Sequence, residues 1–590
     1  MLLHAPEARL VTLLRGYYRS PLCLSSRNGE RAYGTARVLA TSPSGLRRHQ
    51  PGHPPSKRSL TTTSGQPPSN IAILGGGITG LVIAAVTAKL HPNSKITLYE
   101  SSDRLGGWVH SSVVESSDGP VVFELGPRSL RPTTLNGYHA LSLAQQVGLE
   151  QEMVFTSHES AAGSNRFIYY PDKLVRLPSP ADGVPSVLWA MLTNPLFEGL
   201  LLAVFRELTV PCRPRGMVDE SIGGFLRRRL SGAKGLVDNL ASAGMHGIYA
   251  GDVNQLSVRS LVTRWWEAEG KYGSVTAGMM KSKPNKYGQN GTTGLHESGE
   301  QMVGKVLGQK ARASSIYSFT GGMQALPDAV ASTIRRSKNV DIRMATGVSG
   351  IRLAKDGQSI QIKTTNNEPP RPYDHVISTL PAHRLAPLVP IPSLALIPYT
   401  TVMVVNLYYT NPNLIPQPGF GYLIPQSVPF KQNPELALGV VFDSHGTPGV
   451  DNAPGTKLTI MIGGHYWDGR KDDEFPTPEE GRIMAERVLA RHLKITEKPD
   501  RVLATLHKNC IPQYTVGHHD RLQNVDAGIK REFGGRLSVG GSWVDGVGVN
   551  DCVLSGAFAA LTLGKGRTGL ELALESRDKV KAMLPDGFLL

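Results

Sequence analysis

The chain has 590 residues, which is too long for one compact core, so we expect two or more domains. Its hydrophobic content of 40% is typical of a globular protein, and no uninterrupted apolar run approaches the length of a transmembrane helix. The four cysteines lack any Cys-x-x-Cys spacing, which argues against a zinc site or a disulfide framework. The net charge of +15 would indicate an anionic partner if it were evenly spread, but much of it lies near the N-terminus.

Residues 1–69 hold nine Arg and one Lys against two Glu, a net charge of +8 that leaves +7 for the rest of the chain. The segment is also rich in Ser, Pro and Thr, and its first turns can form an amphipathic helix of Leu and Arg. This composition predicts a mitochondrial transit peptide. The alternative is a disordered basic tail, and under either interpretation we exclude the segment from the fold.

The fold is organised around residues 70–100, whose pattern predicts a buried strand, a glycine turn, a helix and a second strand. In such a turn Gly75 permits the tight bend, Gly77 lets the backbone approach a pyrophosphate, and Gly80 lets the helix pack closely on the strand. Glu100 ends the second strand, where its carboxylate can accept hydrogen bonds from ribose hydroxyls. The pattern predicts a dinucleotide site, against the alternative that the glycines serve the turn alone.

A second glycine pair, Gly106-Gly107, follows shortly after Glu100. Two-domain flavoproteins of the amine-oxidase type have a pair of this kind behind the ribose-binding acid, so the sequence resembles that superfamily. The resemblance implies FAD rather than a nicotinamide cofactor. Where the superfamily usually has Arg after the pair, this chain has Trp108.

Three further motifs, at residues 123–129, 247–260 and 510–518, resemble the protoporphyrinogen oxidase family. The first contains Arg128, which the resemblance implies to face the substrate, where its guanidinium can pair with a propionate. The ordinary alternative is an Arg satisfied by a nearby carboxylate. His518 and His519 end the third motif and are either a proton acceptor or structural histidines in a turn, so we assign no general base.

Residues 537–556 predict a strand, a glycine turn and a helix that would place N–H groups beside the flavin ring and the pyrophosphate. Val348 lies where the superfamily commonly presents backbone groups to the adenine. The residues expected to bind FAD, without a covalent bond, are Gly75, Gly77, Ile78, Thr79, Gly80, Glu100, Arg104, Gly106, Gly107, Trp108, Val348, Gly541, Val547, Val549 and Asn550.

The predicted fold class is α/β, with a Rossmann-like FAD-binding domain, a mixed-sheet substrate domain and a helical membrane-associated subdomain. We expect the FAD-binding domain in residues 70–135, 315–381 and 506–590, and the substrate domain in residues 241–270 and 382–505. Residues 136–240 are expected to form the helical subdomain. Residues 271–314, rich in Gly, Lys, Ser and Asn, predict a flexible insertion.

The apolar density of the helical region peaks in residues 184–205, where Asn194 and Pro195 interrupt it. With Arg206, Arg213 and Arg215 beside it, this pattern suits a helical hairpin dipped into one membrane leaflet. A helical subdomain with an ordinary core explains the pattern nearly as well. Resemblance to a family that attaches peripherally to membranes favours the first interpretation.

The resemblance implies an oxygen-dependent oxidoreductase that removes six electrons from protoporphyrinogen IX in three two-electron steps, the penultimate step of haem biosynthesis. O2 accepts the electrons and hydrogen peroxide is released. The resemblance also implies a peripheral location on the mitochondrial inner membrane, facing the intermembrane space. It allows a homodimer and an association with ferrochelatase, and gives no reason to expect a metal or a nucleic acid.

Two other functions stay open. One is a monoamine or polyamine oxidase on the same fold, for which Cys510 lies at a suggestive distance before the last glycine turn to link a flavin covalently. The other is a non-catalytic membrane protein that binds FAD or a tetrapyrrole.

Overall fold

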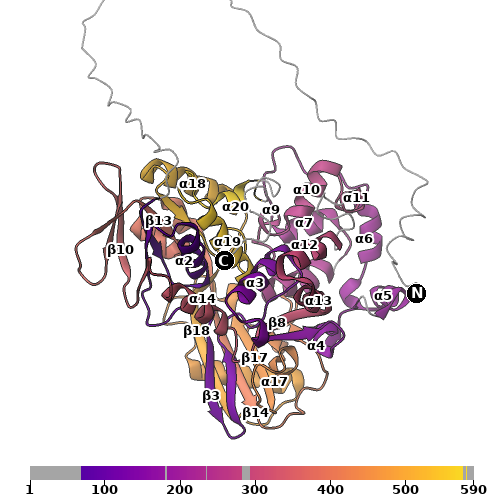
Figure 1. Ribbon diagram of the computed structural model, residues 1–590. Coiled ribbons are helices and arrows are strands. Elements are labelled where there is room, and N and C mark those ends of the chain that lie inside the picture. The colour runs from indigo at the N-terminus through magenta and orange to yellow at the C-terminus, as the bar shows by residue number, and fades with distance from the viewer. Residues whose placement is uncertain (1–67, 180–181, 234, 282–292, 576–579, 581–590) are drawn as a thin grey trace, which may run out of the picture. The chain divides into compact units, whose positions relative to one another are not determined.

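The computed structural model describes residues 68–575 and Val580, apart from residues 180–181, 234 and 282–292 (Figure 1). The predicted transit peptide, residues 1–69, therefore lies almost wholly outside the described residues.

The first sheet has five parallel strands in the order β19-β13-β1-β2-β9. These strands are β1 (Asn70–Leu74), β2 (Lys95–Tyr99), β9 (Val340–Arg343), β13 (His375–Ser378) and β19 (Leu537–Val539). Alternate residues of β1 enter two different cores: Ile71 and Ile73 pack with one cluster, Ala72 and Leu74 with the other. Because helices cover both faces, the strand is a continuous apolar run, as the sequence predicts.

Four helices around this sheet position the cofactor region. They are α2 (Ile78–Leu90), α3 (Leu135–Gln146), α14 (Ala325–Arg335) and α19 (Val549–Leu561). Helix α2 packs against both α14 and α19, and α19 also packs against α3. The first and last parts of the domain are therefore joined helix to helix.

The second sheet has seven strands in the order β18-β14-β17-β16-β15-β6-β7. Their bounds are β6 (Phe167–Tyr169), β7 (Leu174–Arg176), β14 (Tyr399–Tyr409), β15 (Gly421–Leu423), β16 (Ala437–Val441), β17 (Thr456–Gly463) and β18 (Arg501–Pro512). The sheet is mixed, as predicted, since β15 pairs with β6 in parallel and the other neighbours are antiparallel. Helix α17 (Pro478–Leu493) packs on β14 and β18.

Three smaller sheets join these units. They are the hairpin β3 (Ser111–Ser116) with β4 (Gly119–Glu124), the pair β5 (Met153–Ser157) with β8 (Ser314–Phe319), and β10 (Val348–Leu353), β11 (Ile360–Thr364) and β12 (Arg371–Tyr373).

The remaining helices are mostly short. They are α4 (Ala161–Ser164), α5 (Val184–Thr193), α6 (Leu200–Glu207), α7 (Ile222–Arg229), α8 (Ser242–Tyr249), α9 (Val258–Leu261), α10 (Thr263–Tyr272), α11 (Val275–Lys281), α12 (Thr293–Val303), α13 (Lys305–Ala313), α15 (Ala382–Leu385), α16 (Asp443–Gly446), α18 (His518–Phe533) and α20 (Glu571–Leu574). A π-helical turn, Leu236–Ala241, runs directly into α8.

The structure corrects three of the expected boundaries. Residues 136–240 are not only helical, because β6 and β7 complete the second sheet and β5 pairs with β8. The described parts of the segment 271–314, residues 271–281 and 293–314, contain α11, α12 and α13, and Val303, Leu307 and Ala311 are buried in the core beside α3, which a flexible insertion would not be. Strand β18 crosses the boundary at residue 506, because its pairing with β14 continues to Pro512.

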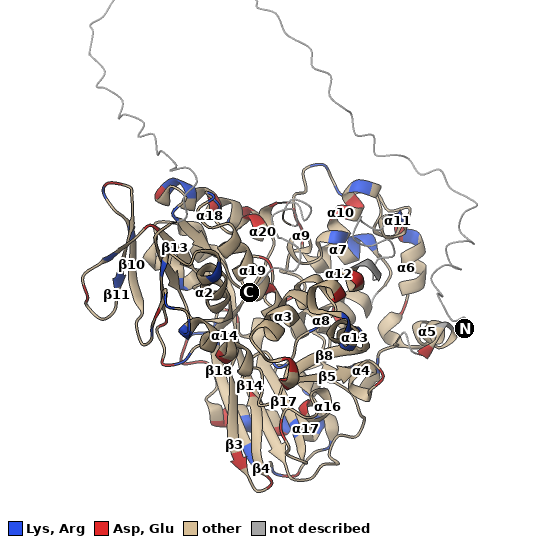
Figure 2. Cartoon of the chain, in the orientation of Figure 1, with Lys and Arg blue, Asp and Glu red and all other residues tan. Residues whose placement is uncertain are grey.

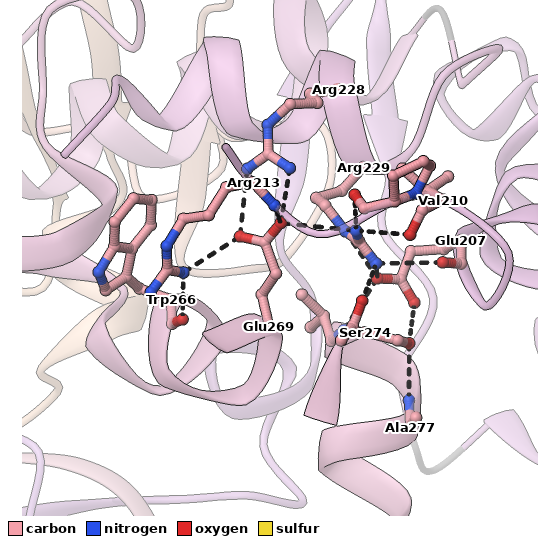
Figure 3. Close-up of polar contacts among 12 residues, drawn as sticks. Glu207, Val210, Arg213, Arg228, Arg229, Trp266, Glu269, Ser274 and Ala277 are labelled. Atoms are coloured by element: carbon pink, nitrogen blue, oxygen red, sulfur yellow. Dashed lines mark hydrogen bonds and ion pairs between the residues drawn. The ribbon is translucent and has the colours of Figure 1, made fainter. Parts of the chain in front are cut away.

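A buried ion network ties α6, α7 and α10 together (Figure 3). The Glu269 carboxylate on α10 forms ion pairs with Arg228, whose Nη1 lies 2.6 Å from Oε1, and with Arg213, whose Nη1 lies 3.2 Å from Oε2. Arg229 donates through Nε to Glu207 Oε1 at 2.8 Å, and both of these side chains are fully buried. Burial opposes the ionisation of Glu269, but the hydrogen bonds from the arginines hold its pKa below the usual value.

Substituting Glu269 by Gln should destabilise this group of helices by about 3–5 kcal/mol, because Arg213 loses its carboxylate partner and Arg228 and Arg229 each lose one of two. Amide hydrogen exchange in α10 measures the effect. The exposed Glu267→Gln should change stability by less than about 0.5 kcal/mol, and an equal loss in both variants would contradict the network. Because the folded pKa of Glu269 is lowered, its stabilisation is complete above about pH 4.3 and is lost as the pH falls through that folded pKa.

Candidate cofactor and substrate site

The first glycine turn lies at the carboxyl end of β1, in the middle of the parallel sheet. Gly75 has a φ of +105°, a conformation that favours glycine, and its N–H donates to Tyr99 O at 2.8 Å. A Cβ on Gly80 would lie 1.9 Å from the carbonyl oxygen of Gly75, so only glycine permits this contact of helix and strand. Gly77 is the N-cap of α2, and Ile78 is the first helical residue. The N-terminus of α2 is therefore available to a phosphate.

The Glu100 carboxylate folds back onto this turn. Its Oε2 accepts from Gly76 N at 2.7 Å, and its Oε1 accepts from Ser102 N at 2.8 Å. The carbonyl oxygen of Glu100 accepts from Thr346 N at 2.7 Å, two residues before Val348 starts β10. The structure thus brings Val348 to the ribose end of the predicted site.

The second glycine pair lies directly against the first turn. Gly106 N donates to Gly76 O at 2.9 Å, and Gly106 forms an isolated bridge with Gly77. Arg104 fastens this loop, since its guanidinium donates to the carbonyl oxygens of Gly107 and Val109. These bonds to backbone oxygens mean that the Arg104 side chain stabilises the Gly106-Gly107 loop.

The C-terminal part of the chain closes on the same edge of the sheet. Thr79 Oγ1 on α2 donates to Cys552 O on α19 at 3.2 Å, over 473 residues of sequence. Gly541 N donates to Ser555 Oγ at 3.0 Å, so the turn after β19 rests on α19. Helix α19 starts at Val549, and the loop before it contains Val547.

Asn550 has an unsatisfied side-chain oxygen at this edge. Its Nδ2 donates to Arg131 O at 3.0 Å, but its buried Oδ1 has no hydrogen-bond partner among the described residues. The N-termini of α2 and α19 lie at this edge together with the glycine turns at Gly75 and Gly541. With the unpaired Asn550 Oδ1, they form a site that fits a flavin adenine dinucleotide.

The loop behind Gly541 is held by Tyr514. Its hydroxyl donates to Ser542 O at 2.6 Å and accepts from Gly546 N at 2.7 Å. The Tyr514 ring stacks on His518 with centroids 4.1 Å apart, and burial lowers the pKa of His518 to about 3. His518 is thus a buried ring stacked on Tyr514, and neither of its ring nitrogens has a hydrogen-bond partner among the described residues.

Trp108 lies between the two domains, because its ring meets the ring of His507 on β18 edge to face at 5.3 Å. His507 Nε2 in turn lies 2.7 Å from Leu125 O, next to the segment that leads to Arg128. Trp108, which stands where the superfamily usually has Arg, thus places an aromatic ring between the cofactor loop and β18.

Arg128 is only 7% exposed and pairs through Nη1 with Asp443 at 3.1 Å. Asp443 also accepts from Thr459 Oγ1 on β17 at 2.6 Å. The other terminal nitrogen, Arg128 Nη2, is buried without a hydrogen-bond partner in the described part of the chain. Close by, burial raises the pKa of Glu124 to about 7, although Met323 N and Ser111 Oγ donate to it.

Sequence reasoning missed Asp443, which belongs to no motif and reaches Arg128 over 315 residues of sequence. In the segments that the structure describes, no group of three or more His, Cys, Asp or Glu side chains could hold a metal ion.

Comparison with known proteins agrees with this architecture. The family described as flavin containing amine oxidoreductase matches residues 78–563. A protoporphyrinogen oxidase of Schizosaccharomyces pombe is 34% identical over 503 residues, 84% of this chain and 98% of that protein. A human protoporphyrinogen oxidase is 33% identical over 511 residues, again 84% of this chain and 98% of that protein.

The fold is shared with solved structures as well. A structure from Exiguobacterium sp. 255-15, itself provisionally called a protoporphyrinogen oxidase, aligns with a TM-score of 0.63 and 22% identity over 85% of this chain and 99% of its own. These findings confirm the predicted fold, the FAD cofactor and an oxidoreductase. The chain therefore belongs to the flavin containing amine oxidoreductases, in the branch of that family that contains the protoporphyrinogen oxidases.

Proposed function

We propose that the chain oxidises protoporphyrinogen IX to protoporphyrin IX in three two-electron steps, with O2 as the acceptor and H2O2 as the second product. One observation carries the proposal: relatives of that name match over 98% of their length, so the similarity includes both the cofactor sheet and the substrate sheet. Bound FAD supplies the chemistry, since a flavin accepts a hydride from carbon. The protein binds and orients the macrocycle and excludes water from it.

Arg128 is the residue that we assign to a propionate of the substrate. Asp443 holds one side of its guanidinium, and the partnerless Nη2 leaves a donor for a second carboxylate. A buried guanidinium that one carboxylate satisfies only in part is a strong recognition element for another.

The environment of Cys510 argues against a flavin-linked amine oxidase. Its Sγ lies on β18 and donates to Thr400 O at 3.5 Å. Burial raises the pKa of this thiol to about 12, so the nucleophilic thiolate is scarce. Non-covalent FAD is therefore the arrangement that we propose. The other alternative, a non-catalytic carrier of flavin or tetrapyrrole, differs from the enzyme in that protoporphyrinogen IX would not reduce its flavin.

Protoporphyrinogen IX mixed anaerobically with the protein should bleach the flavin absorbance, because the substrate reduces the bound FAD. Addition of O2 should restore the absorbance and produce porphyrin fluorescence, with three H2O2 per porphyrin by the electron count. Protein stripped of FAD is the control. A flavin that stays oxidised under anaerobic conditions would reject the enzyme in favour of a carrier.

Arg128→Ala should raise KM for protoporphyrinogen IX about tenfold or more, since a buried charged hydrogen bond is worth about 1.5–3 kcal/mol. Steady-state kinetics with the dimethyl ester of the substrate shows whether Arg128 binds the propionate or only stabilises the fold. The ester has no carboxylate, so wild type and variant should bind it equally well. If the variant loses the acid and the ester to the same extent, Arg128 serves the fold through Asp443 and not the substrate.

We also propose that the protein binds a membrane surface through α5 and α6. No single helix in the described ranges is long and apolar enough to cross a membrane, whereas Pro185–Thr193 and Pro195–Glu207 satisfy length and composition only as a pair bent by 86°. Trp189 is 69%, Leu192 70% and Phe205 59% exposed. Helix α5 has no charged residue, α6 has Arg206 and Glu207 in its last turn, and further Lys and Arg lie on α7, α10 and α11 (Figure 2). A bent apolar pair with cations near it suits an interfacial helix.

The double substitution Trp189→Glu with Phe205→Glu should weaken binding to vesicles of phosphatidylcholine with an anionic lipid at least about tenfold, because two carboxylates must enter the interface. Flotation measures the bound fraction. Leu396→Glu changes a side chain that is 63% exposed elsewhere, and it should leave binding unchanged. Equal binding of the double variant and the wild type would contradict the proposal.

The proposed location is the mitochondrial inner membrane, on the side that faces the intermembrane space. The Arg-rich, acid-poor composition of residues 1–69 supports the mitochondrial part, and the exposed apolar helices support peripheral attachment. A homodimer and an association with ferrochelatase belong to the same proposal, to be measured by light scattering and co-purification.

A further inference from the structure

The C-terminal glycine loop, residues 540–548, joins β19 to α19 and begins at the carboxyl edge of the parallel sheet. Gly540 N donates to Ser378 O at 3.0 Å, at the end of β13. A Cβ on Gly540 would lie 3.4 Å from Thr79 Cγ2, in the first turn of α2. The loop thus leaves the sheet beside the start of α2 and ends at the N-terminus of α19, so both of its ends lie at the cofactor site.

Glycine gives this loop unusual conformational freedom, since four of its nine residues are glycines. Gly541 has a φ of +114° and Gly546 a φ of +129°, both in the region that favours glycine. A glycine-rich segment populates many backbone conformations unless other contacts restrict it. Side-chain contacts are therefore needed to keep the loop in one conformation.

Two side chains each hold one point of the C-terminal glycine loop. Trp543 is 1% exposed, and its Nε1 donates to Leu380 O, outside the loop, at 3.1 Å. Asp551, on α19, accepts through Oδ2 from Gly548 N at 3.2 Å. Neither of these two contacts pairs a backbone group of residues 542–546.

Tyr514 spans residues 542–546 from outside the loop. Its hydroxyl donates to Ser542 O at 2.6 Å and accepts from Gly546 N at 2.7 Å, so one oxygen joins backbone groups four residues apart. Burial raises the pKa of Tyr514 well above its usual value of about 10, so the hydroxyl keeps the proton that it donates. Without this oxygen, both backbone groups lose a hydrogen-bond partner.

The position of the Tyr514 hydroxyl is set by contacts outside the loop. The residue is 2% exposed and lies where the chain leaves β18 for α18. Its carbonyl oxygen accepts from Ser257 N, at the N-cap of α9, at 2.8 Å. Its ring stacks on His518, and the ring of Tyr249, at the end of α8, lies 6.2 Å away. The hydroxyl therefore keeps its place whatever conformation the loop adopts.

The loop held in this way leads directly to unpaired N–H groups at the start of α19. Val549 and Asn550 are the first two residues of the helix, so their N–H groups have no acceptor within it. Val547 N also has no hydrogen-bond acceptor among the described residues. Such groups can bind an anionic ligand, and a change of backbone conformation at Gly546 would move them.

We propose that Tyr514 is a positioning residue for FAD, whose hydroxyl holds residues 542–546 in the backbone conformation that binds the cofactor. The inference depends on the flavin cofactor of the family and not on the substrate proposed above. Without the hydroxyl the loop populates other conformations, and FAD binds only the fraction of molecules in which the loop has the right one. The apparent dissociation constant rises by the inverse of that fraction.

Tyr514→Phe keeps the ring and its stacking on His518 and removes only the hydroxyl. The dissociation constant for FAD should rise about tenfold or more, which corresponds to a binding conformation in about a tenth of the molecules or fewer. Serial dilution of the full-length holoprotein, with released FAD measured by its fluorescence, gives this constant. No substrate is present, so the result does not depend on whether protoporphyrinogen IX reduces the flavin.

Tyr408→Phe is the matched control. Tyr408, on β14, is fully buried, and its hydroxyl donates to Asp118 Oδ2 at 2.6 Å and accepts from Gly455 N at 3.2 Å. Its hydroxyl thus contacts the turn between β3 and β4 and not the C-terminal glycine loop. Each variant loses one donated and one accepted hydrogen bond, so thermal unfolding should be affected similarly. The control should bind FAD within about twofold of the wild type.

A dissociation constant for Tyr514→Phe within about twofold of the wild type would overturn the inference, as would an equal rise in both variants, because the hydroxyl would then only stabilise the fold. Hydrogen exchange at Gly546 in the wild-type holoprotein needs no variant and decides the matter if Tyr514→Phe does not fold. The bond to Tyr514 should protect this N–H. Exchange as fast as in an unstructured peptide would show that the hydroxyl does not hold the loop and would equally overturn the inference.

Discussion

The site depends on the parallel pairing of β1 with β2 on one side and β13 on the other. Carboxyl ends of parallel strands meet at one edge, so this pairing brings the glycine turn after β1, Glu100 after β2 and Thr379 after β13 together. Thr379 Oγ1 donates to Leu74 O at 2.9 Å and thereby fastens the third of these ends to the first. The cofactor cradle is a property of this edge and not of any one motif.

The C-terminal segment belongs to the same edge of the sheet. Strand β19 pairs with β13, and its helix α19 packs on α2, so the last part of the chain completes a sheet begun near residue 70. Between them lies the substrate sheet, whose strands come from residues 167–176 and 399–512. An enzyme that oxidises a large macrocycle needs cofactor and substrate surfaces held rigidly against each other, and this interleaved chain path provides that.

Buried polar groups divide into two kinds in this molecule. In the Glu269 network every carboxylate meets guanidinium donors, which fixes α6, α7 and α10 and gives the exposed apolar helices a rigid base. At Arg128 and Asn550 the structure leaves a donor or an acceptor open. Satisfied clusters stabilise the fold, whereas open groups beside the cradle are where a cofactor, a substrate or a proton can bind.

The sequence by itself determined the local features that short-range chemistry controls. Strand β1, the turn at Gly75 to Gly80 and the glycine turn before α19 follow from apolar periodicity and from backbone geometry that requires glycine. The resemblance at Gly106-Gly107 then indicated the cofactor, and the resemblance of residues 123–129 and 510–518 indicated the family; the comparisons confirm both.

Only the tertiary structure decided which distant residues meet. No local pattern predicts that Asp443 reaches Arg128, that β6 and β7 join the substrate sheet, or that His246 faces His465 over 219 residues of sequence. Helices α11 to α13 were missed because each is too short to show a clear period; α12 packs against α3 and α13, and α11 packs against α10. Local chemistry specifies elements, but long-range burial and hydrogen bonding choose their partners, and the open groups at the site arise from that choice.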